Sequence, residues 1–212
     1  MIKKSRPQAL LIKIEKHLKI LHPPVEAFEN SIRTTPFKVL ISILISSRTK
    51  DEVTLKASQK LFKVADTPEK MLQLGEERIA GLIYPVGFYR QKADNILKIC
   101  RAVLERGGVP SEFEELVRLP GVGRKTANLV LALAFDRPAV AVDTHVFRIS
   151  RRLGWTGGNT PEAVEGELTE LFPVHLWNKL NKTLVGFGQT VCKPRNPDCG
   201  KCPVGSDCPH FN

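Results

Sequence analysis

The chain has 212 residues, of which 42% are hydrophobic, so it can bury a sizeable core as one large domain or two small ones. Its formal net charge of +10 favours a polyanionic partner, with nucleic acid ahead of an anionic membrane surface. The sequence excludes a membrane-spanning helix, because it holds no run of about 20 apolar residues. Its basic start lacks the apolar region and the cleavage site of a signal peptide, so we expect a cytoplasmic protein.

The first half of the chain is predicted to be helical. Apolar residues at spacings of three and four run up to the break at His22-Pro23-Pro24, namely Leu10, Leu11, Ile14, Leu18 and Leu21. Residues 36–47 are apolar on every side, which is typical of a central buried helix, although their Val and Ile content would also suit a strand. Cys100 lies on an apolar helix face and is expected in the core. Further helices are expected over 51–62, 67–74, 76–83 and 92–106.

The second half continues the helical pattern. A capping box, Ser111 followed by Glu114, predicts a short helix over 111–118. The stretch LPGVGRKTANLVLAL follows it directly at 119–133, and later helices are expected over 143–155, from Pro161 onward, and over 177–186. Because neither an alternating apolar–polar stretch nor an Asn-Gly hairpin turn occurs, we predict an all-α fold.

The sequence LPGVG between two predicted helices indicates a helical hairpin with a very tight loop. Gly121 and Gly123 can adopt positive φ angles at little steric cost, and they let another molecule approach the backbone. The amides that open the next helix are unpaired and favour an anion, with Arg124 and Lys125 adding positive charge. A phosphate contact is one interpretation of these features, and a plain turn between helices is the other.

Four of the five cysteines fall near the end of the chain with the spacing C-x6-C-x2-C-x5-C, at Cys192, Cys199, Cys202 and Cys208. In a reducing compartment, clustered thiols indicate a metal centre rather than disulfides. Ligation by thiolates alone suits both zinc and an iron–sulfur cluster, and the spacing by itself leaves both open.

Asp143 directly precedes the basic helical stretch THVFRISRR. Aspartate is among the best N-cap residues, so its position alone predicts a cap for this helix. A capping carboxylate accepts backbone N–H bonds and stays ionised, so a structural role does not exclude a functional one. Arg148, Arg151 and Arg152 form a basic face on the same helix, which predicts either solvated surface charge or contacts with a phosphate backbone.

Three stretches together resemble the endonuclease III family: LPGVGRKTANLVLAL at 119–133, AVDTHVFRISRRLGW at 141–155, and the cysteine-rich tail. Members of this family are DNA glycosylases of the helix-hairpin-helix type, with a Gly/Pro-rich loop and an essential aspartate. The resemblance runs from about Pro36 to Cys208. It implies that the four cysteines bind a [4Fe–4S] cluster in a loop over 192–208, which displays Lys193 and Arg195 toward DNA phosphates.

The resemblance also implies the catalytic residues. Glycosylases of this kind break the bond between a damaged base and C1′ of its deoxyribose after the base has left the duplex stack. Lys125 matches the family's nucleophilic lysine, whose unprotonated amine forms a Schiff base at C1′ and permits β-elimination. Asp143 matches the essential aspartate, whose carboxylate can stabilise an oxocarbenium-like sugar. A lysine that only contacts phosphate is the alternative at position 125.

Three further residues are expected at the DNA. Phe88 occupies the position of the family's wedge, which fills the stack vacated by the base; a buried turn residue is the alternative. Arg48 stands where bacterial members have glutamine, so readout of the opposite strand departs from the family, and an arginine there can hydrogen-bond guanine or stack. His145, near a helix start, either contacts phosphate or sugar or is structural.

The resemblance implies two helical lobes with a substrate cleft between them, so that Lys125 and Asp143 face each other across it. We expect one lobe over 28–137 with the hairpin, and a second lobe formed by 1–27 plus 138–212 with the cluster loop. The expected function is a bifunctional DNA glycosylase and AP lyase of base excision repair, which excises oxidised pyrimidines from double-stranded DNA and cleaves the abasic strand by β-elimination.

Two other functions stay open at this point. A monofunctional glycosylase for mismatched thymine or adenine typically lacks the lysine, and the adenine enzymes carry an extra C-terminal domain, whereas this chain has Lys125 and ends four residues after Cys208. A non-catalytic DNA-binding or redox module would use the same hairpin and cluster. We expect a monomer, because no sustained heptad occurs. We also expect the protein to associate with the nucleoid and to have no membrane partner.

Overall fold

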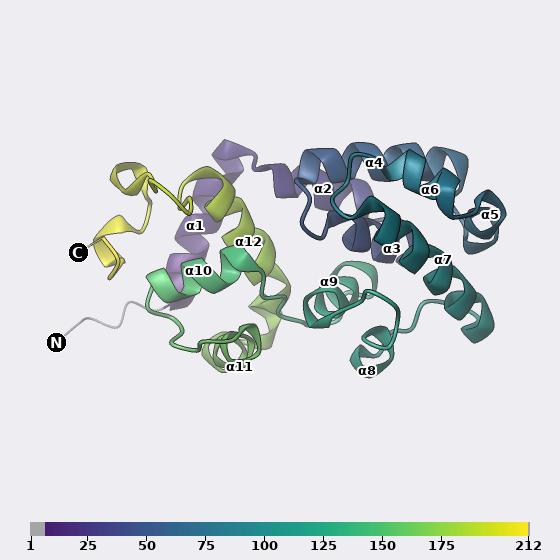
Figure 1. Ribbon diagram of the computed structural model, residues 1–212. Coiled ribbons are helices and arrows are strands. Elements are labelled where there is room, and N and C mark those ends of the chain that lie inside the picture. Colours follow the sequence, from purple (N-terminus) through teal and green to yellow (C-terminus); the bar gives the residue numbers. More distant parts are fainter. Residues whose placement is uncertain (1–6, 212) are drawn as a thin grey trace. The chain divides into compact units, whose positions relative to one another are not determined.

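The computed structural model describes residues 7–211, and this part of the chain is all helical, with twelve α-helices, three short 3-10 helices and no strand (Figure 1). The predicted all-α class is confirmed. Residues 1–6 and Asn212 lie outside the described residues. The prediction that the basic start of the chain is not a signal peptide therefore falls partly on residues that the structure does not describe. Within the described part, no helix is both long and apolar enough to cross a membrane.

The chain divides into two compact units, one formed by Met1–Ala27 with Pro138–Asn212 and the other by Phe28–Arg137. In its described residues the first unit holds α1 (Pro7–Leu21), α10 (Thr144–Arg152), α11 (Pro161–Leu171), η1 (Val174–Leu176), α12 (Trp177–Thr190), η2 (Cys199–Lys201) and η3 (Gly205–Asp207). The second unit holds α3 (Pro36–Ser46), α4 (Asp51–Val64), α5 (Pro68–Leu74), α6 (Glu76–Ile83), α7 (Tyr89–Arg106), α8 (Phe113–Leu116) and α9 (Arg124–Ala134). Helix α2 (Pro24–Ile32) begins in the first unit and ends in the second.

Helix α3 is the centre of the second unit. The Thr35 hydroxyl accepts a hydrogen bond from the amide of Lys38, and Pro36 occupies the first turn, where its missing N–H costs nothing. Eight of the eleven α3 residues are buried, and the helix packs against α4, α7 and α9. The predicted central helix is therefore confirmed over 36–46, and the strand alternative is excluded.

The first unit is built around α1 and α12, which pack against each other, while α12 also packs against α10. Four of the five predicted stripe residues in α1 are buried, Leu10, Leu11, Ile14 and Leu18. Leu21 differs, with 41% of its surface exposed, because it is the last residue of the helix before the proline break. The sequence pattern also missed α2, since the Pro23-Pro24 break ends one helix and at once supplies a first-turn proline for the next.

The predicted capping box at Ser111 is wrong. Helix α8 begins only at Phe113, and its N-cap, Glu112, makes no side-chain cap bond. The carbonyl oxygen of Ser111 and the carboxylate of Glu112 both accept hydrogen bonds from the Arg137 guanidinium instead. This long-range charged contact competes with the local cap and shortens the helix. Elsewhere Thr67 and Thr160 cap α5 and α11, and Cys100 is fully buried, as predicted.

Candidate functional site

The hairpin between α8 and α9 is shaped by Gly121. This residue has φ +76°, and a Cβ built on it would lie 2.4 Å from Nδ2 of Asn95 on α7. A side chain at this position would be strained at this φ angle and would have to displace the Asn95 side chain, so glycine is favoured here. The turn that contains Gly121 is closed by a hydrogen bond from the amide of Val122 to the carbonyl oxygen of Leu119.

Gly123 is a glycine for a different reason. It is the N-cap of α9 with φ −92°, so the positive φ angle that its sequence permits is not used. Among the described residues nothing lies within 4 Å of where its Cβ would be. The position of the missing Cβ is therefore open at the N-cap of α9, the end of the helix at which the dipole favours an anion.

Lys125 stands in the first turn of α9 and is partly buried. It lies one residue after Arg124, whose guanidinium carbon is 4.9 Å from the ring centroid of Phe113 on α8. This cation–π contact ties the start of α9 to the other arm of the hairpin. The hairpin thus holds a primary amine and a guanidinium beside a glycine-lined helix start.

Asp143 caps α10, as its position predicts. Its Oδ1 accepts hydrogen bonds from the amides of His145 at 2.9 Å and Val146 at 2.8 Å. Capping therefore engages one of the two carboxylate oxygens and holds the side chain in one orientation. The Nδ1 atom of His145 lies 3.3 Å from Nη2 of Arg148, so this histidine forms part of a side-chain network on α10.

Arg48 and Phe88 form a pair in the second unit. Arg48 lies in the loop between α3 and α4, and Phe88 is the N-cap of α7; both have left-handed backbones, with φ +54° and +58°. The guanidinium carbon of Arg48 lies 5.4 Å from the centroid of the Phe88 ring. Phe88 exposes 64% of its surface, so it is not a buried turn residue.

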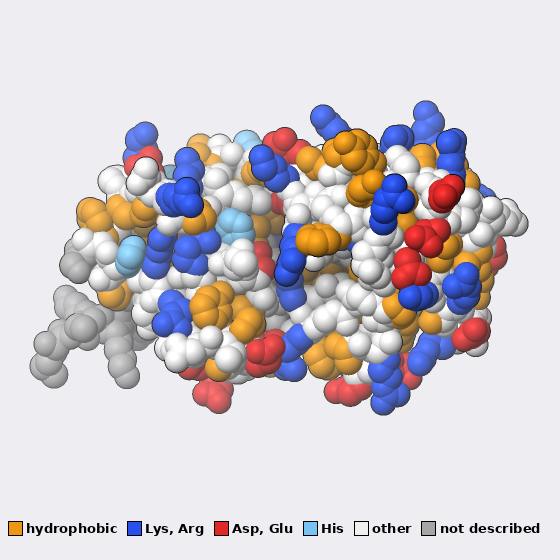
Figure 2. Space-filling view, viewed as in Figure 1, with side chains coloured by type: hydrophobic (Ala, Val, Ile, Leu, Met, Phe, Trp, Pro, Cys, Tyr) orange, Lys and Arg blue, Asp and Glu red, His pale blue; other side chains and the backbone are white. Residues whose placement is uncertain are grey.

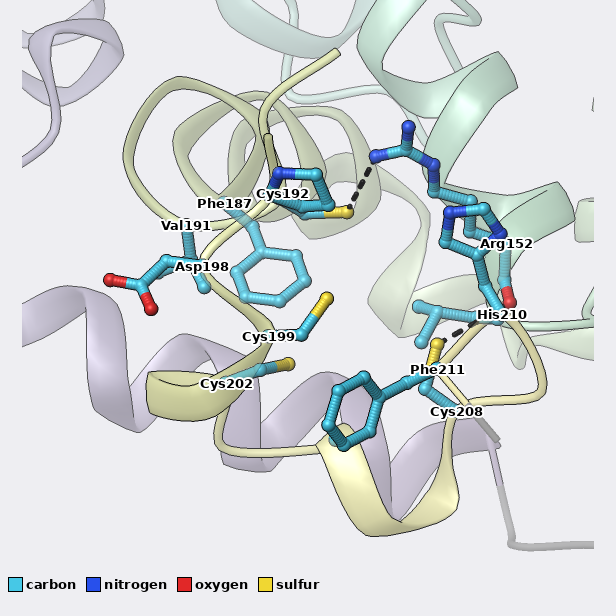
Figure 3. Close-up of a pocket in the computed structure, with 13 residues that line it drawn as sticks. Arg152, Phe187, Val191, Cys192, Asp198, Cys199, Cys202, Cys208, His210 and Phe211 are labelled. Atoms are coloured by element: carbon cyan, nitrogen blue, oxygen red, sulfur yellow. Dashed lines mark hydrogen bonds between the residues drawn. The ribbon is translucent and has the colours of Figure 1, made fainter. Parts of the chain in front are cut away.

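The four cysteines of the tail line one pocket, with Arg152 and Phe187 among its other walls (Figure 3). Its empty volume is about 370 Å³, including the part open to solvent. None of these cysteines is in a disulfide. Among residues 7–211, no group of three or more His, Cys, Asp or Glu side chains could hold a single metal ion. The four cysteines instead line the same pocket from different sides.

The chemistry of this pocket fits an iron–sulfur cluster. Burial raises the pKa of the Cys202 thiol, and the neighbouring thiols of Cys208, Cys192 and Cys199 raise it further. A thiolate is therefore disfavoured here without positive charge nearby, and bound iron supplies that charge. Cys192, Cys199, Cys202 and Cys208 would each provide one thiolate to such a cluster.

Two arginines of α10 hold the start of the cysteine segment in place. Arg148 donates to the carbonyl oxygen of Cys192 at 2.9 Å, and Arg152 donates to the carbonyl oxygens of Lys193 at 2.8 Å and Pro194 at 3.0 Å. Arg151 instead binds the carbonyl oxygen of Gly158. The basic face predicted on this helix is thus largely occupied by contacts within the protein.

Exposed basic residues remain around this segment. Lys193 and Arg195 are both exposed, and on the face drawn in Figure 2 Lys and Arg side chains gather over α10 and the C-terminal segment. The predicted site residues thus fall into two groups by unit. Arg48, Phe88, Gly121, Gly123, Arg124 and Lys125 belong to the second unit, and Asp143, His145, Lys193, Arg195 and the four cysteines belong to the first.

Sequence reasoning missed a buried lysine in the second unit. Lys92 is only 6% exposed and lies on the buried face of α7 with Ala93, Ile96 and Ile99. Its position on an apolar helix stripe is a signal visible in the sequence, since lysine is almost never fully buried without partners. Asn95, which packs over Gly121, gave no comparable signal.

Residues 41–174 match the HhH-GPD superfamily of base excision DNA repair proteins, and residues 192–208 match the iron-sulfur binding domain of endonuclease III. Endonuclease III of Thermotoga maritima is 50% identical over 184 residues, covering 86% of both chains. Endonuclease III of Escherichia coli K12 is 41% identical over 189 residues, covering 88% of both.

Solved structures agree with these relatives. A trapped endonuclease III–DNA covalent intermediate matches with a TM-score of 0.89 and 34% identity, covering 100% of this chain and 98% of that one. A thermostable thymine-DNA glycosylase matches with a TM-score of 0.75 and 27% identity, covering 94% of this chain and 96% of that one.

Proposed function

Since the chain belongs to the endonuclease III family of base excision repair enzymes, we propose that it excises oxidised pyrimidines from double-stranded DNA and cleaves the resulting abasic strand. The single observation that carries this proposal is Lys125, an amine in the first turn of α9 beside the open space at Gly123. A related endonuclease III, 34% identical to this chain, has been trapped as a covalent intermediate with DNA. A lysine amine is the group that such a covalent step requires.

Lys125 is the proposed nucleophile. Its unprotonated Nζ attacks C1′ of the damaged nucleotide, and the base leaves with the electrons of the glycosidic bond and a proton. The sugar ring then opens to give an imine between C1′ and Nζ. Loss of a C2′ proton from this imine expels the 3′ phosphate, which cleaves the strand by β-elimination. Hydrolysis of the imine returns the free amine.

Asp143 is the proposed electrostatic partner of this reaction. Its carboxylate stabilises the positive charge that develops on the sugar as the base departs, which is worth most when the carboxylate is already fixed in place. The two amide hydrogen bonds to Oδ1 supply that fixation. The cap and the catalytic carboxylate are thus the same side chain.

The proposed DNA contacts follow from charge and exposure. The hairpin, with Gly121, Gly123 and Arg124, offers amides and a guanidinium to a phosphate, and Phe88 is exposed enough to stack in the place of the extruded base. Arg48 beside it can hydrogen-bond a guanine edge. On the first unit, we assign His145, Lys193 and Arg195 to the DNA backbone.

The tail is the iron–sulfur binding domain of this family. We assign Cys192, Cys199, Cys202 and Cys208 as ligands of a [4Fe–4S] cluster, one thiolate to each iron. When bound, the cluster supplies structural cross-links for a segment too short to build its own core. The protein's part is to hold that segment with Arg148 and Arg152, so that Lys193 and Arg195 stay on the surface.

Borohydride trapping tests the proposal. Wild type, Lys125→Gln and the control Lys98→Gln are incubated with a duplex containing thymine glycol and with a duplex containing a preformed abasic site. Lys98 is exposed and forms an ion pair with Asp94 four residues earlier, so its change should leave activity intact. We expect a covalent adduct with wild type and with Lys98→Gln, and none with Lys125→Gln.

Other outcomes would replace the proposal with an alternative. Release of the base by wild type without a trapped adduct would indicate a monofunctional glycosylase. Binding of both duplexes, and of a panel of other oxidised or mismatched bases, with neither base release nor adduct would indicate a non-catalytic DNA-binding or redox module. An adduct that persists in Lys125→Gln would assign the nucleophile to another amine.

A further inference from the structure

Resting on the proposed function, we propose that Lys92 is a positioning residue: it joins the start of α7 to the loop between α3 and α4, and so fixes Phe88 and Arg48 as one rigid element that enters DNA. The backbone conformations of Phe88 and Arg48 both need support from surrounding residues. Each stands in a left-handed backbone conformation, which is strained for a residue with a side chain. The surrounding contacts must therefore hold both conformations in place.

The ammonium group of Lys92 supplies the first of these contacts. Its Nζ lies 2.7 Å from the carbonyl oxygen of Ile45, 2.6 Å from that of Ser47 and 3.3 Å from Oγ1 of Thr49. These three acceptors match the three donors of an ammonium group. Burial lowers the pKa of Lys92 to about 8, so the group is still mostly protonated at neutral pH and all three donors are present.

Thr49 extends the connection to the residue before Phe88. Its Oγ1 accepts from Nζ of Lys92 and also from the amide of Gly87 at 3.2 Å. Gly87 in turn lies so close to the other loop that a Cβ built on it would be 2.9 Å from the carbonyl oxygen of Arg48. The backbones of the two loops are therefore in close contact directly beside the exposed pair.

A purely structural role is the competing explanation. The last carbonyl groups of a helix lack intrahelical partners, and a lysine near them satisfies those acceptors and the helix dipole. That role accounts for the bonds from Lys92 to Ile45 and Ser47 at the end of α3. It does not account for the bridging hydroxyl of Thr49 or the contact at Gly87, which act on the position of Phe88. The two roles predict different results with different DNA substrates.

Two substrates separate these roles. A duplex containing thymine glycol requires base extrusion and filling of the vacated stack. A single strand with a preformed abasic site requires neither, because it has no damaged base and no opposite strand. We expect Lys92→Met and Thr49→Val to cleave the duplex about 10- to 100-fold more slowly than wild type, as misplacement of a positioning group does. Borohydride trapping on the abasic single strand should stay within about twofold. The control Lys98→Met, on the exposed face of α7, should match wild type on both substrates.

A double-mutant cycle gives the second readout. If Lys92 acts through the Phe88–Arg48 pair, Lys92→Met should cause a clearly smaller further loss of duplex cleavage in a Phe88→Ala background than in wild type. Equal losses on the two substrates, unchanged duplex cleavage, or additive losses with Phe88→Ala would each overturn the proposal and leave Lys92 as a structural residue or an inessential one. Thr49→Val, which removes only a hydroxyl, keeps the test valid should Lys92→Met unfold. A wild type inactive on both substrates would contradict the proposed function instead.

Discussion

Arg152 is joined directly to the first and the last of the four tail cysteines. Its Nη1 lies 3.4 Å from Sγ of Cys192, and its carbonyl oxygen accepts from Sγ of Cys208 at 3.5 Å. The same guanidinium also donates to the carbonyl oxygens of Lys193 and Pro194. The guanidinium therefore places positive charge beside the first of the four sulfur atoms. This residue of α10 thus connects the helical core of the first unit to the cluster segment.

Replacing Arg152 should make the cluster easier to lose. We expect Arg152→Met to release iron about 10- to 100-fold faster than wild type under a chelator, the range typical of residues that support metal ligands. The visible absorption of the cluster and the iron content of the protein measure this rate. Arg151→Met is the matched control, because Arg151 lies next in the helix but binds Gly158 and Asn159. Equal rates for both variants would show that Arg152 does not support the cluster.

Asp143 can be tested by separating its cap from its charge. Asparagine is as good an N-cap as aspartate, so Asp143→Asn should keep the stability of α10 within a few tenths of a kcal/mol, whereas Asp143→Ala should lose about 1 kcal/mol. Both changes remove the carboxylate, so both should lower base excision by about 10²-fold or more. Thermal unfolding and single-turnover excision measure the two effects. If Asp143→Asn kept full activity, the residue would be a cap and nothing more.

The stability of the hairpin should depend on the fit between Gly121 and the side chain of Asn95. Gly121→Ala should destabilise the second unit by about 1 to 3 kcal/mol, since alanine is strained at φ +76° and its Cβ would meet the side chain of Asn95. Adding Asn95→Ala should recover the part due to the clash and leave the part due to strain. Urea unfolding of the two variants measures both parts. The control Gly81→Ala, at an exposed helix position with no neighbour within 4 Å, should not destabilise.

Periodic and local signals in the sequence predicted most of the fold. The uninterrupted apolar run of α3 requires burial on every side, and Thr67, Asp143 and Thr160 cap their helices through bonds to residues two or three positions on. The cap predicted at Asp143 forms through such local bonds, whereas the capping box predicted at Ser111 does not form. Its outcome depended on Arg137, a residue far along the chain that no local pattern identifies.

In the candidate site, too, features set by local sequence could be predicted, whereas features that depend on distant residues could not. The glycines of the hairpin and the cysteine spacing carry their own geometric meaning, so they could be identified from sequence. Lys92 could not be assigned a role, because its partners Ile45 and Ser47 lie more than forty positions away and contribute only backbone carbonyls. Every residue has a backbone carbonyl group, so the sequence does not indicate which carbonyls accept hydrogen bonds from a distant lysine. The contacts of Arg148 and Arg152 were missed for the same reason: the sequence predicted solvated charge or phosphate contacts, whereas both side chains bind backbone carbonyls far along the chain.

Lys92 also predicts how stability depends on pH. Burial lowers its pKa from the ordinary value of 10.5 to about 8, so between these two values the unfolded chain binds more protons than the folded protein. The free energy of unfolding contributed by this group therefore rises with pH from about 8 to 10.5, by at most about 1.4 kcal/mol per pH unit. Lys92→Met lacks this group. The stability of wild type relative to the variant should therefore increase across that window.

Urea unfolding at several pH values from 7 to above 10 measures this difference. The other charged groups on the two segments that meet at Lys92 are present in both proteins, so their titration cancels when the two are compared: Arg48, Lys50, Asp51, Arg90 and Asp94. Below about pH 8 the lysine is protonated in both states, so the two stability curves should run parallel there. Curves that stay parallel up to pH 10 would show that the ammonium group keeps its ordinary pKa, because its three acceptors offset the burial completely.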